Sequence, residues 1–263
     1  PCINAVVPSG PYTVVDFHYA GGVMNVMKML ESKLYTDVPS MYGNTWADML
    51  SRVKAQENKV IHSLEKPLFN EPGLKILRGN LSPNGAIVRP TAVYDEVKYM
   101  KGKAKVFEGD RPAFEAIMAG EIVPGDIIVI RYEGCKGAPG MKELMLSIDA
   151  LIGLGLDKSV GLISDARFSG FNYGAIIGHV SPEAYDGGNI ALVENGDEIV
   201  IDIPNGEVSM LVSEEELERR RAAWVCPPLK EEKGCLNIFA KMCRPAEEGG
   251  AMQPWDLDAK FHR

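Results

Sequence analysis

The chain has 263 residues, of which 46% are hydrophobic and 24% charged, and it carries a formal net charge of −8. The acidic balance without a basic stripe excludes the usual nucleic-acid binder, and no apolar run reaches the roughly 18 residues of a membrane span. Five widely spaced cysteines fit no disulfide framework, so we predict a cytoplasmic protein with room for one large or two smaller domains.

The first segment has a helical pattern. Residues 13–35 place apolar side chains at helical spacing, interrupted by Gly21 and Gly22, and a second helix is predicted over 44–53 with Asn44 as its N-cap. The chain begins with Pro1, and its opening residues resemble the middle of a domain. We therefore expect a fragment or a processed product.

From about residue 66 the composition changes to short β-rich runs separated by Gly, Pro, Asn and Asp. A helix over 111–120 is predicted to be capped by Asp110, and another is predicted over 139–156. Strands are predicted within 73–79, 85–90, 104–109, 125–134 and 158–163.

Residues 189–213 are predicted to form three strands joined by two Asn-Gly turns, and a helix capped by Ser213 and Glu216 follows. Residues 226–263 show little periodicity and are expected to wrap the surface. The gaps between Cys226, Cys235, Cys243 and His262 do not match a zinc knuckle. Hairpins combined with strand–helix–strand units predict an α/β fold built on a closed or nearly closed barrel with flanking helices.

Residues 131–143 leave a predicted strand and pass through three glycines and a proline. Such turns can direct backbone N–H groups at an anion, but no Gly-Lys-Ser/Thr follows, so this is not a P-loop. Glu143 lies near the predicted first helical turn. Its carboxylate is either a partner of the helix dipole or a ligand for a hard cation such as Mg²⁺.

The stretch SDARFSG, residues 164–170, places Ser169 just after a predicted strand. A serine nucleophile needs a base, and the glycines of the hydrolase G-x-S-x-G pattern are replaced here by Arg167 and Phe171. A turn is the simplest interpretation from these residues alone. In the nearby loop 178–188, His179 and Glu183 are interpreted as a buried histidine and part of a capped turn.

Five strings occur in the order found in the dihydroxy-acid dehydratase / phosphogluconate dehydratase family. They are GNLSPNGAIV (79–88), GDIIVIRYEGCKGAPGMKE (125–143), SDARFSG (164–170), GHVSPEA (178–184) and NGDEIVIDIPN (195–205). Residues 8–23 also resemble that family's mid-chain segment. The similarity extends from about residue 1 to 224.

The resemblance implies an iron–sulfur hydro-lyase that dehydrates a 2,3-dihydroxy carboxylic acid to a 2-keto acid. In that family's pattern, Ser169 matches the proton-abstracting base and Glu143 matches a Mg²⁺ ligand. The residues matched to substrate binding are Gly140, Met141 and Gly170. The motifs mix two subgroups, so the expected substrate is either a dihydroxy acid such as 2,3-dihydroxyisovalerate or a sugar acid. Phe171 and Asn172 also replace a threonine that both subgroups carry nearby.

The resemblance also implies an organisation: residues 1–65 as the tail of an N-terminal cluster-binding domain, 66–225 as a swivelling β-barrel domain, and 226–263 as a C-terminal extension. The family's cluster cysteines, for a 2Fe–2S or 4Fe–4S cluster, lie upstream and match none of the five here. We therefore expect the missing N-terminal half as a partner, a homo-oligomer, and a fragment that is inactive alone. The alternative is a non-catalytic partial homologue that binds a small anion or a partner chain.

Overall fold

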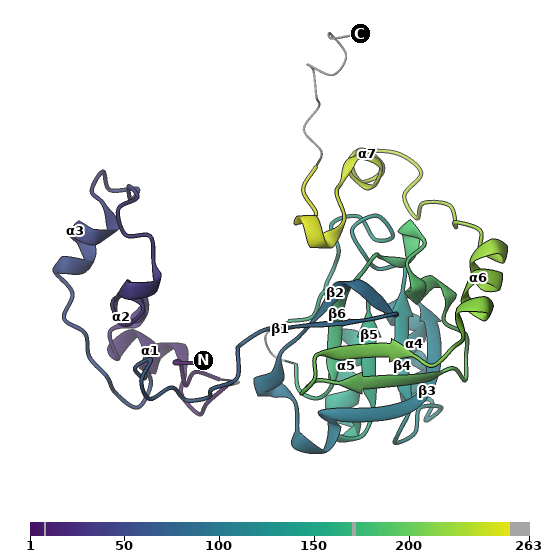
Figure 1. The fold of residues 1–263 in the computed structure, drawn as a ribbon, viewed down its shortest axis with the longest axis horizontal. Helices are drawn as coiled ribbons and strands as arrows, with labels where there is room; N and C mark the ends of the chain where they lie inside the picture. The colour runs from purple at the N-terminus through teal and green to yellow at the C-terminus, as the bar shows by residue number, and fades with distance from the viewer. Residues whose placement is uncertain (8, 170–171, 253–263) are drawn as a thin grey trace, which may run out of the picture. The chain divides into compact units, whose positions relative to one another are not determined.

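The computed structural model describes residues 1–7, 9–169 and 172–252, which form two compact units with the boundary after Gly73 (Figure 1). The assignment of residues 1–65 to a cluster-binding domain stays a prediction. Among the described residues, no helix combines the length and the apolar character that crossing a membrane requires.

The first unit contains short helices in place of the predicted long one. Gly21 has a φ of 102°, in the left-handed region that favours glycine, so the helical segment breaks there. The predicted N-cap Asn44 is wrong: Thr45 Oγ1 accepts the backbone N–H of Asp48 at 3.1 Å and caps the helix instead. The elements are α1 (Val14–Tyr19), α2 (Gly22–Met29), η1 (Glu31–Lys33) and α3 (Trp46–Ser51).

In the second unit, eight described strands close into a barrel in the order β1-β2-β6-β5-β4-β3-β7-β8, which confirms the predicted α/β fold and its barrel. Strands β3, β4, β5 and β6 pair in parallel, and antiparallel hairpins flank them. The strands are β1 (Lys75–Gly79), β2 (Ser82–Val88), β3 (Tyr99–Glu108), β4 (Ile127–Arg131), β5 (Gly161–Ser164), β6 (Ile176–Ser181), β7 (Glu198–Asp202) and β8 (Glu207–Met210).

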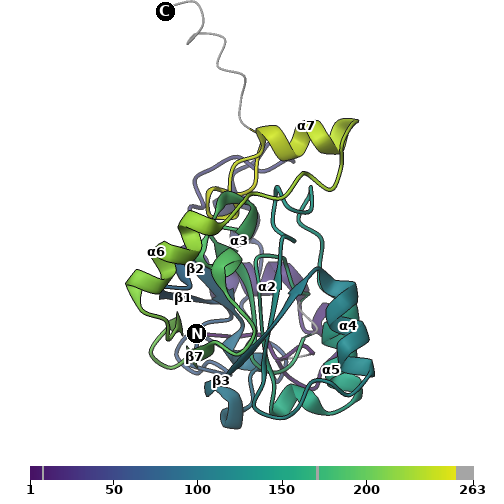
Figure 2. The same cartoon turned by 90° about the vertical axis from the view of Figure 1, so that its right-hand side faces the viewer.

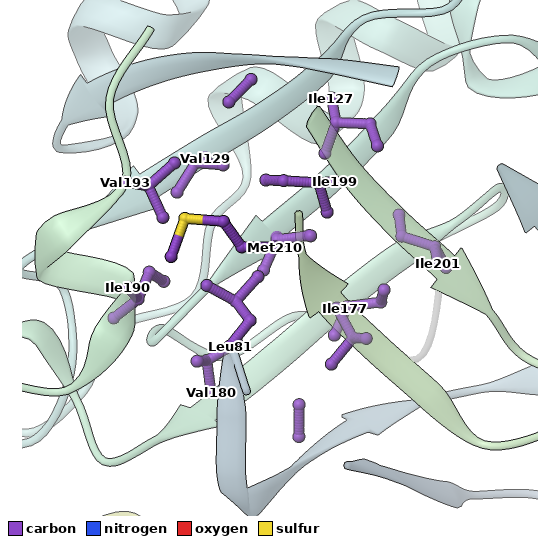
Figure 3. Close-up of a cluster of buried hydrophobic side chains, with 14 of the residues drawn as sticks. Leu81, Ile127, Val129, Ile177, Val180, Ile190, Val193, Ile199, Ile201 and Met210 are labelled. Carbon is purple, nitrogen blue, oxygen red and sulfur yellow. The ribbon is translucent and has the colours of Figure 1, made fainter. Parts of the chain in front are cut away.

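The barrel has one apolar core inside and a second one outside. Ile127 and Val129 of β4 point into the interior, where Figure 3 shows them facing side chains of β6, β7 and β8. The alternate residues Ile128 and Ile130 belong to the outer cluster, against the helices. Strand β4 is therefore buried on both faces, and this explains its continuous apolar run.

Helices α4 (Asp110–Met118) and α5 (Leu146–Gly153) follow β3 and β4 and lie side by side on one flank of the barrel (Figure 2). Two predictions fail here. The N-cap of α4 is Gly109, and the Asp110 carboxylate instead accepts the N–H groups of Leu146 (3.2 Å) and Ser147 (3.1 Å) at the start of α5. Helix α5 starts well after residue 139, because Gly140 and Met141 both have positive φ, which an α-helix does not contain.

The predicted strand at residue 189 is wrong, because the segment forms a 3-10 helix, η6 (Asn189–Leu192). Arginines from other elements bind its carbonyl groups: Arg131 donates to Ala191 O at 2.6 Å and Arg220 to Leu192 O at 2.9 Å. The remaining elements are η2 (Pro90–Ala92), η3 (Asp95–Val97), η4 (Leu156–Lys158), η5 (Ala184–Asp186), α6 (Glu214–Ala223), α7 (Cys235–Met242) and η7 (Ala246–Glu248).

Helix α6 begins as predicted, since Ser213 Oγ accepts the N–H of Glu216 at 3.3 Å. The Glu216 carboxylate does not complete the capping box. It pairs instead with Arg219 and Arg220, at 2.6 and 2.9 Å.

Candidate functional site

The loops that follow β4, β5 and β6 meet at one end of the barrel, because parallel strands carry their carboxyl ends to the same side. Asp165, directly after β5, joins all three loops. Its buried carboxylate accepts the N–H groups of Tyr132 (3.1 Å) and Glu133 (3.0 Å) after β4 and of Ala184 (2.9 Å) after β6. Asp165 therefore fixes the loops that carry the candidate residues.

Glu183 holds the glycine-rich loop after β4. Its carboxylate accepts the N–H groups of Lys136 at 2.9 Å and Gly137 at 3.1 Å. A Cβ atom on Gly134 would lie 2.2 Å from Glu183 Oε2, so a glycine is required for this approach. Here the loop's backbone donors bind an internal carboxyl group, that of Glu183.

Burial dominates the titration of both carboxyl groups. Desolvation raises the pKa of Asp165 to about 6 and that of Glu183 to about 7, and the backbone N–H donors oppose this rise. Burial also lowers the pKa of His179, helped by the nearby positive charge of Arg167. Burial therefore disfavours the charged form of all three side chains.

Ser169 and Glu143 lie on neighbouring backbone segments. Residues 143 and 167 form an isolated parallel bridge, in which Leu144 N donates to Arg167 O at 2.9 Å. The Glu143 side chain is exposed, and Ser169, two residues beyond the bridge, is half-buried. Glu143 does not lie in a first helical turn as predicted, since α5 starts only at Leu146.

Glu143 fits a hard cation as one ligand of several. Within the described residues its carboxylate makes no ion pair, so its oxygens are available to a metal such as Mg²⁺. No group of three or more His, Cys, Asp or Glu side chains in the described part of the chain could complete a metal site.

The five cysteines do not fit an iron–sulfur cluster. Cys135 and Cys243 are buried in one apolar cluster with Met141, and desolvation raises the pKa of Cys135 to about 12. Cys226 and Cys235 are exposed. A cluster needs several converging thiolates, which the described residues do not supply.

A pocket of about 400 Å³ lies beside the bridge. Two of the predicted substrate-binding residues, Gly140 and Met141, line it together with Arg167 and His179. Gly170, the third, lies outside the described residues. Neither Glu143 nor Ser169 is among the described residues that line this pocket.

Asn172 is buried, and its Oδ1 has no hydrogen-bond partner among the described residues.

Three non-glycine residues near this end of the barrel have left-handed backbone: Tyr132 (φ 63°), Met141 (φ 52°) and His179 (φ 56°). Such residues cost of order 1–3 kcal/mol each and cluster at functional sites. The His179 ring packs edge-on against Phe168, with ring centroids 6.3 Å apart. The predicted loop is wrong at this residue, because His179 lies within strand β6, and its side chain is half-buried.

The C-terminal segment forms the other wall of the pocket, through Phe239, Ala246 and Gly250, and sequence reasoning missed this. The expected lack of periodicity is wrong, because α7 places Leu236, Phe239, Ala240 and Cys243 at helical spacing. That spacing is the signal that could have identified the segment. A further contact, from Lys230 Nζ to Tyr132 O at 2.7 Å, fixes the segment to the loop after β4.

Comparison with known proteins gives one consistent family. Residues 59–250 match the family described as "Dihydroxy-acid/6-phosphogluconate dehydratase C-terminal", and residues 1–49 match its N-terminal counterpart. Proteins named dihydroxy-acid dehydratase from Clostridium novyi and Pyrobaculum neutrophilum are 45% and 44% identical over 96% and 97% of this chain. A Methanosarcina barkeri protein of the same name is 45% identical over 95%. The chain covers 46% of each of these relatives.

Proposed function

The chain belongs to the dihydroxy-acid/6-phosphogluconate dehydratase family, and from this premise we propose that it is the C-terminal part of a hydro-lyase. The reaction removes water from a 2,3-dihydroxy carboxylic acid and gives a 2-keto acid after the enol tautomerises. The complete enzyme requires the N-terminal half, which the relatives' greater length accommodates. The chain alone is inactive.

Ser169 is the proposed base: its Oγ takes the proton from C2 as the C3 hydroxyl departs. A serine oxygen is a weak base in water, so the role requires nearby positive charge and N–H donors. The observation that carries the proposal is the backbone bridge between residues 143 and 167. It brings two motifs from separate loops together, which supports a role for the Glu143 carboxylate as a hard-cation ligand beside the segment that holds Ser169.

Glu143 would hold Mg²⁺ with ligands from outside the described residues, and the bound ion would supply positive charge for the substrate carboxylate. Gly140, Met141 and Gly170 are the proposed substrate contacts. An iron–sulfur cluster in the complete enzyme rests on family resemblance alone, because the cysteines described above do not form its site. A cytoplasmic homo-oligomer is proposed on the same basis.

The substrate class is a 2,3-dihydroxy acid, either branched-chain or sugar-derived. Asn172 is a candidate for substrate recognition, because its buried amide oxygen lacks a hydrogen-bond partner among the described residues. A substrate hydroxyl is a suitable donor to such an oxygen. We therefore propose Asn172 as a contributor to substrate choice.

The test uses the complete gene product, purified and reconstituted without oxygen, and assayed with 2,3-dihydroxyisovalerate and a panel of aldonic acids. Ser169→Ala should lower kcat by about 10²–10⁴-fold, the usual worth of a general base, while the cluster absorbance is unchanged. Ser159→Ala, in the 3-10 turn before β5, is the matched control and should retain activity. Near-normal turnover in Ser169→Ala would refute the assignment.

A further inference from the structure

We propose that Arg167 is a positioning residue that holds the Glu143 segment against the Ser169 segment. The inference rests on the proposed function for the roles of Glu143 and Ser169. Arg167 is suited to this because its backbone and its side chain bind the same neighbouring segment, residues 139–145, at different points.

The backbone contacts enclose Glu143 on both sides. Arg167 O accepts the N–H of Leu144 at 2.9 Å, and Arg167 N donates to Lys142 O at 3.4 Å. The segment that contains Ala166 and Arg167 is also joined to β6 on its other side, because His179 N donates to Ala166 O at 2.9 Å. The segment that leads to Ser169 is thus bonded to the Glu143 segment on one side and to β6 on the other.

The side chain then binds the turn that precedes Glu143. The guanidinium donates through Nε to Met141 O and through Nη2 to Gly140 O, the latter at 3.2 Å. Two consecutive carbonyl groups are reached by one planar group, which is a geometry that a guanidinium provides and an ammonium does not. Both residues have positive φ, so Arg167 binds the strained part of the loop.

Other contacts also hold residues 139–145, because Met141 is buried in the cluster with Cys135 and Cys243 and Leu144 is buried in the outer core. Among the described residues, Met141 N donates to Ala138 O at 2.7 Å within the turn itself, and Lys142 Nζ lies 3.2 Å from buried Glu133. Asp110 fixes the chain only from Leu146 onward. The Arg167 contacts fix the backbone carbonyl and N–H groups on both sides of Glu143, and so help to set where Glu143 lies relative to Ser169.

The side chain of Arg167 faces away from the outer core. Ala166 and Phe168 both pack on the outer core cluster, whereas Arg167 between them is exposed, as in an extended segment whose alternate side chains face opposite ways. Arg167 is exposed and adds nothing to either apolar core. Its removal should disturb the site more than the global fold.

The experiment compares Arg167→Gln and Arg167→Lys with the wild-type complete enzyme, reconstituted without oxygen. Mn²⁺ binding is measured by calorimetry, and deuterium uptake of peptides covering 139–145 is measured by mass spectrometry. We expect Arg167→Gln to weaken Mn²⁺ binding about 10–100-fold, as for other residues that orient metal ligands, and to raise uptake in that segment but not in β4 or β5. Arg167→Lys should only partly restore both, since an ammonium does not bind the two carbonyls as a fork.

Arg111→Gln is the matched control, because Arg111 is exposed on α4 and pairs only loosely with Glu115 at 3.6 Å. It should match wild type in both measurements. Wild-type Mn²⁺ affinity and uptake in Arg167→Gln would overturn the inference, as would full restoration by lysine. If Arg167→Gln does not fold, Mn²⁺ binding and deuterium uptake of Arg167→Lys decide whether Arg167 has this positioning role.

Glu143→Gln separates this inference from the proposed function. If that variant binds Mn²⁺ as wild type does, the metal role of Glu143 fails, whereas the uptake measurement still decides whether Arg167 holds the segment. If Glu143→Gln loses Mn²⁺ and both Arg167 variants match wild type, only the positioning role of Arg167 is refuted.

Discussion

At the scale of single residues, internal carboxylates organise this end of the barrel. Asp165 and Glu183 bind backbone N–H groups of loops distant in sequence. The sequence placed Asp165 in a turn after a strand, but its partners depend on which strands are neighbours. No local pattern contains that information. The same holds for Arg167, whose partners are carbonyl groups and therefore have no residue-type signature.

These carboxyl groups predict a pH dependence of stability. Burial raises the pKa of Glu183 from 4.5 to about 7, so the folded chain binds more protons than the unfolded chain between those values. The contribution of Glu183 is therefore fully present below pH 4.5 and is lost as the pH rises through 7. Glu183→Gln should remove a pH-dependent part of the unfolding free energy of about 3 kcal/mol, since each unit of pKa corresponds to about 1.4 kcal/mol.

Urea unfolding of the chain, followed by circular dichroism between pH 4.5 and 7.5, measures this difference. The control is Glu121→Gln, an exposed carboxylate in the loop between α4 and β4, which should keep the wild-type slope. Identical slopes for Glu183→Gln and wild type would contradict the prediction.

At the scale of elements, strands and helices defined by local patterns were predictable, and boundaries set by distant groups were not. The β-rich runs of β1, β2, β3 and β4 and the turn between β7 and β8 formed as expected. Helix α5 starts late and η6 replaces a strand, because tertiary contacts with Arg167 and with Arg131 and Arg220 bind the backbone there. The order of the elements was therefore more predictable than their ends.

Two glycines give opposite predictions for the same substitution. Gly134→Ala places a methyl group against the Glu183 carboxylate, 2.2 Å from Oε2, and should destabilise the chain by about 1–3 kcal/mol. Gly153→Ala, in the last turn of α5, meets no atom within 4 Å and should stabilise it by about 0.5–1 kcal/mol. Thermal unfolding of the two variants side by side checks this, and a loss of stability in both would contradict it.

At the scale of the whole molecule, the two units differ greatly in apolar burial. The barrel unit has an inner and an outer core, whereas the fully buried apolar side chains described in the first unit are few. Residues 74–252 should therefore unfold cooperatively when expressed alone, and residues 1–73 should not. Tryptophan fluorescence follows the unfolding of each piece separately, since Trp46 lies in the first unit and Trp224 in the second. A cooperative transition in residues 1–73 alone would contradict this.

The barrel and the candidate base and metal ligand were predictable for different reasons. Alternating hairpins and strand–helix–strand units indicated the barrel from physical patterns, whereas Ser169 and Glu143 came from resemblance, because a serine in a turn and an exposed glutamate carry no signal alone. The pocket was not predictable. It requires the loop after β4 and the C-terminal segment to meet, which Lys230 and the Cys135–Cys243 cluster bring about.

Closure of the barrel has a consequence for how this chain associates with others. Each of the described strands has a neighbour on both sides, although β1 and β8 meet at a single residue pair, so none of them is a free edge along its whole length for a strand from another chain. We therefore expect association with other chains to depend mainly on side-chain contacts. The loops at the site end can also change in length and sequence without creating an edge prone to aggregation, which leaves substrate recognition free to diverge on a fixed barrel.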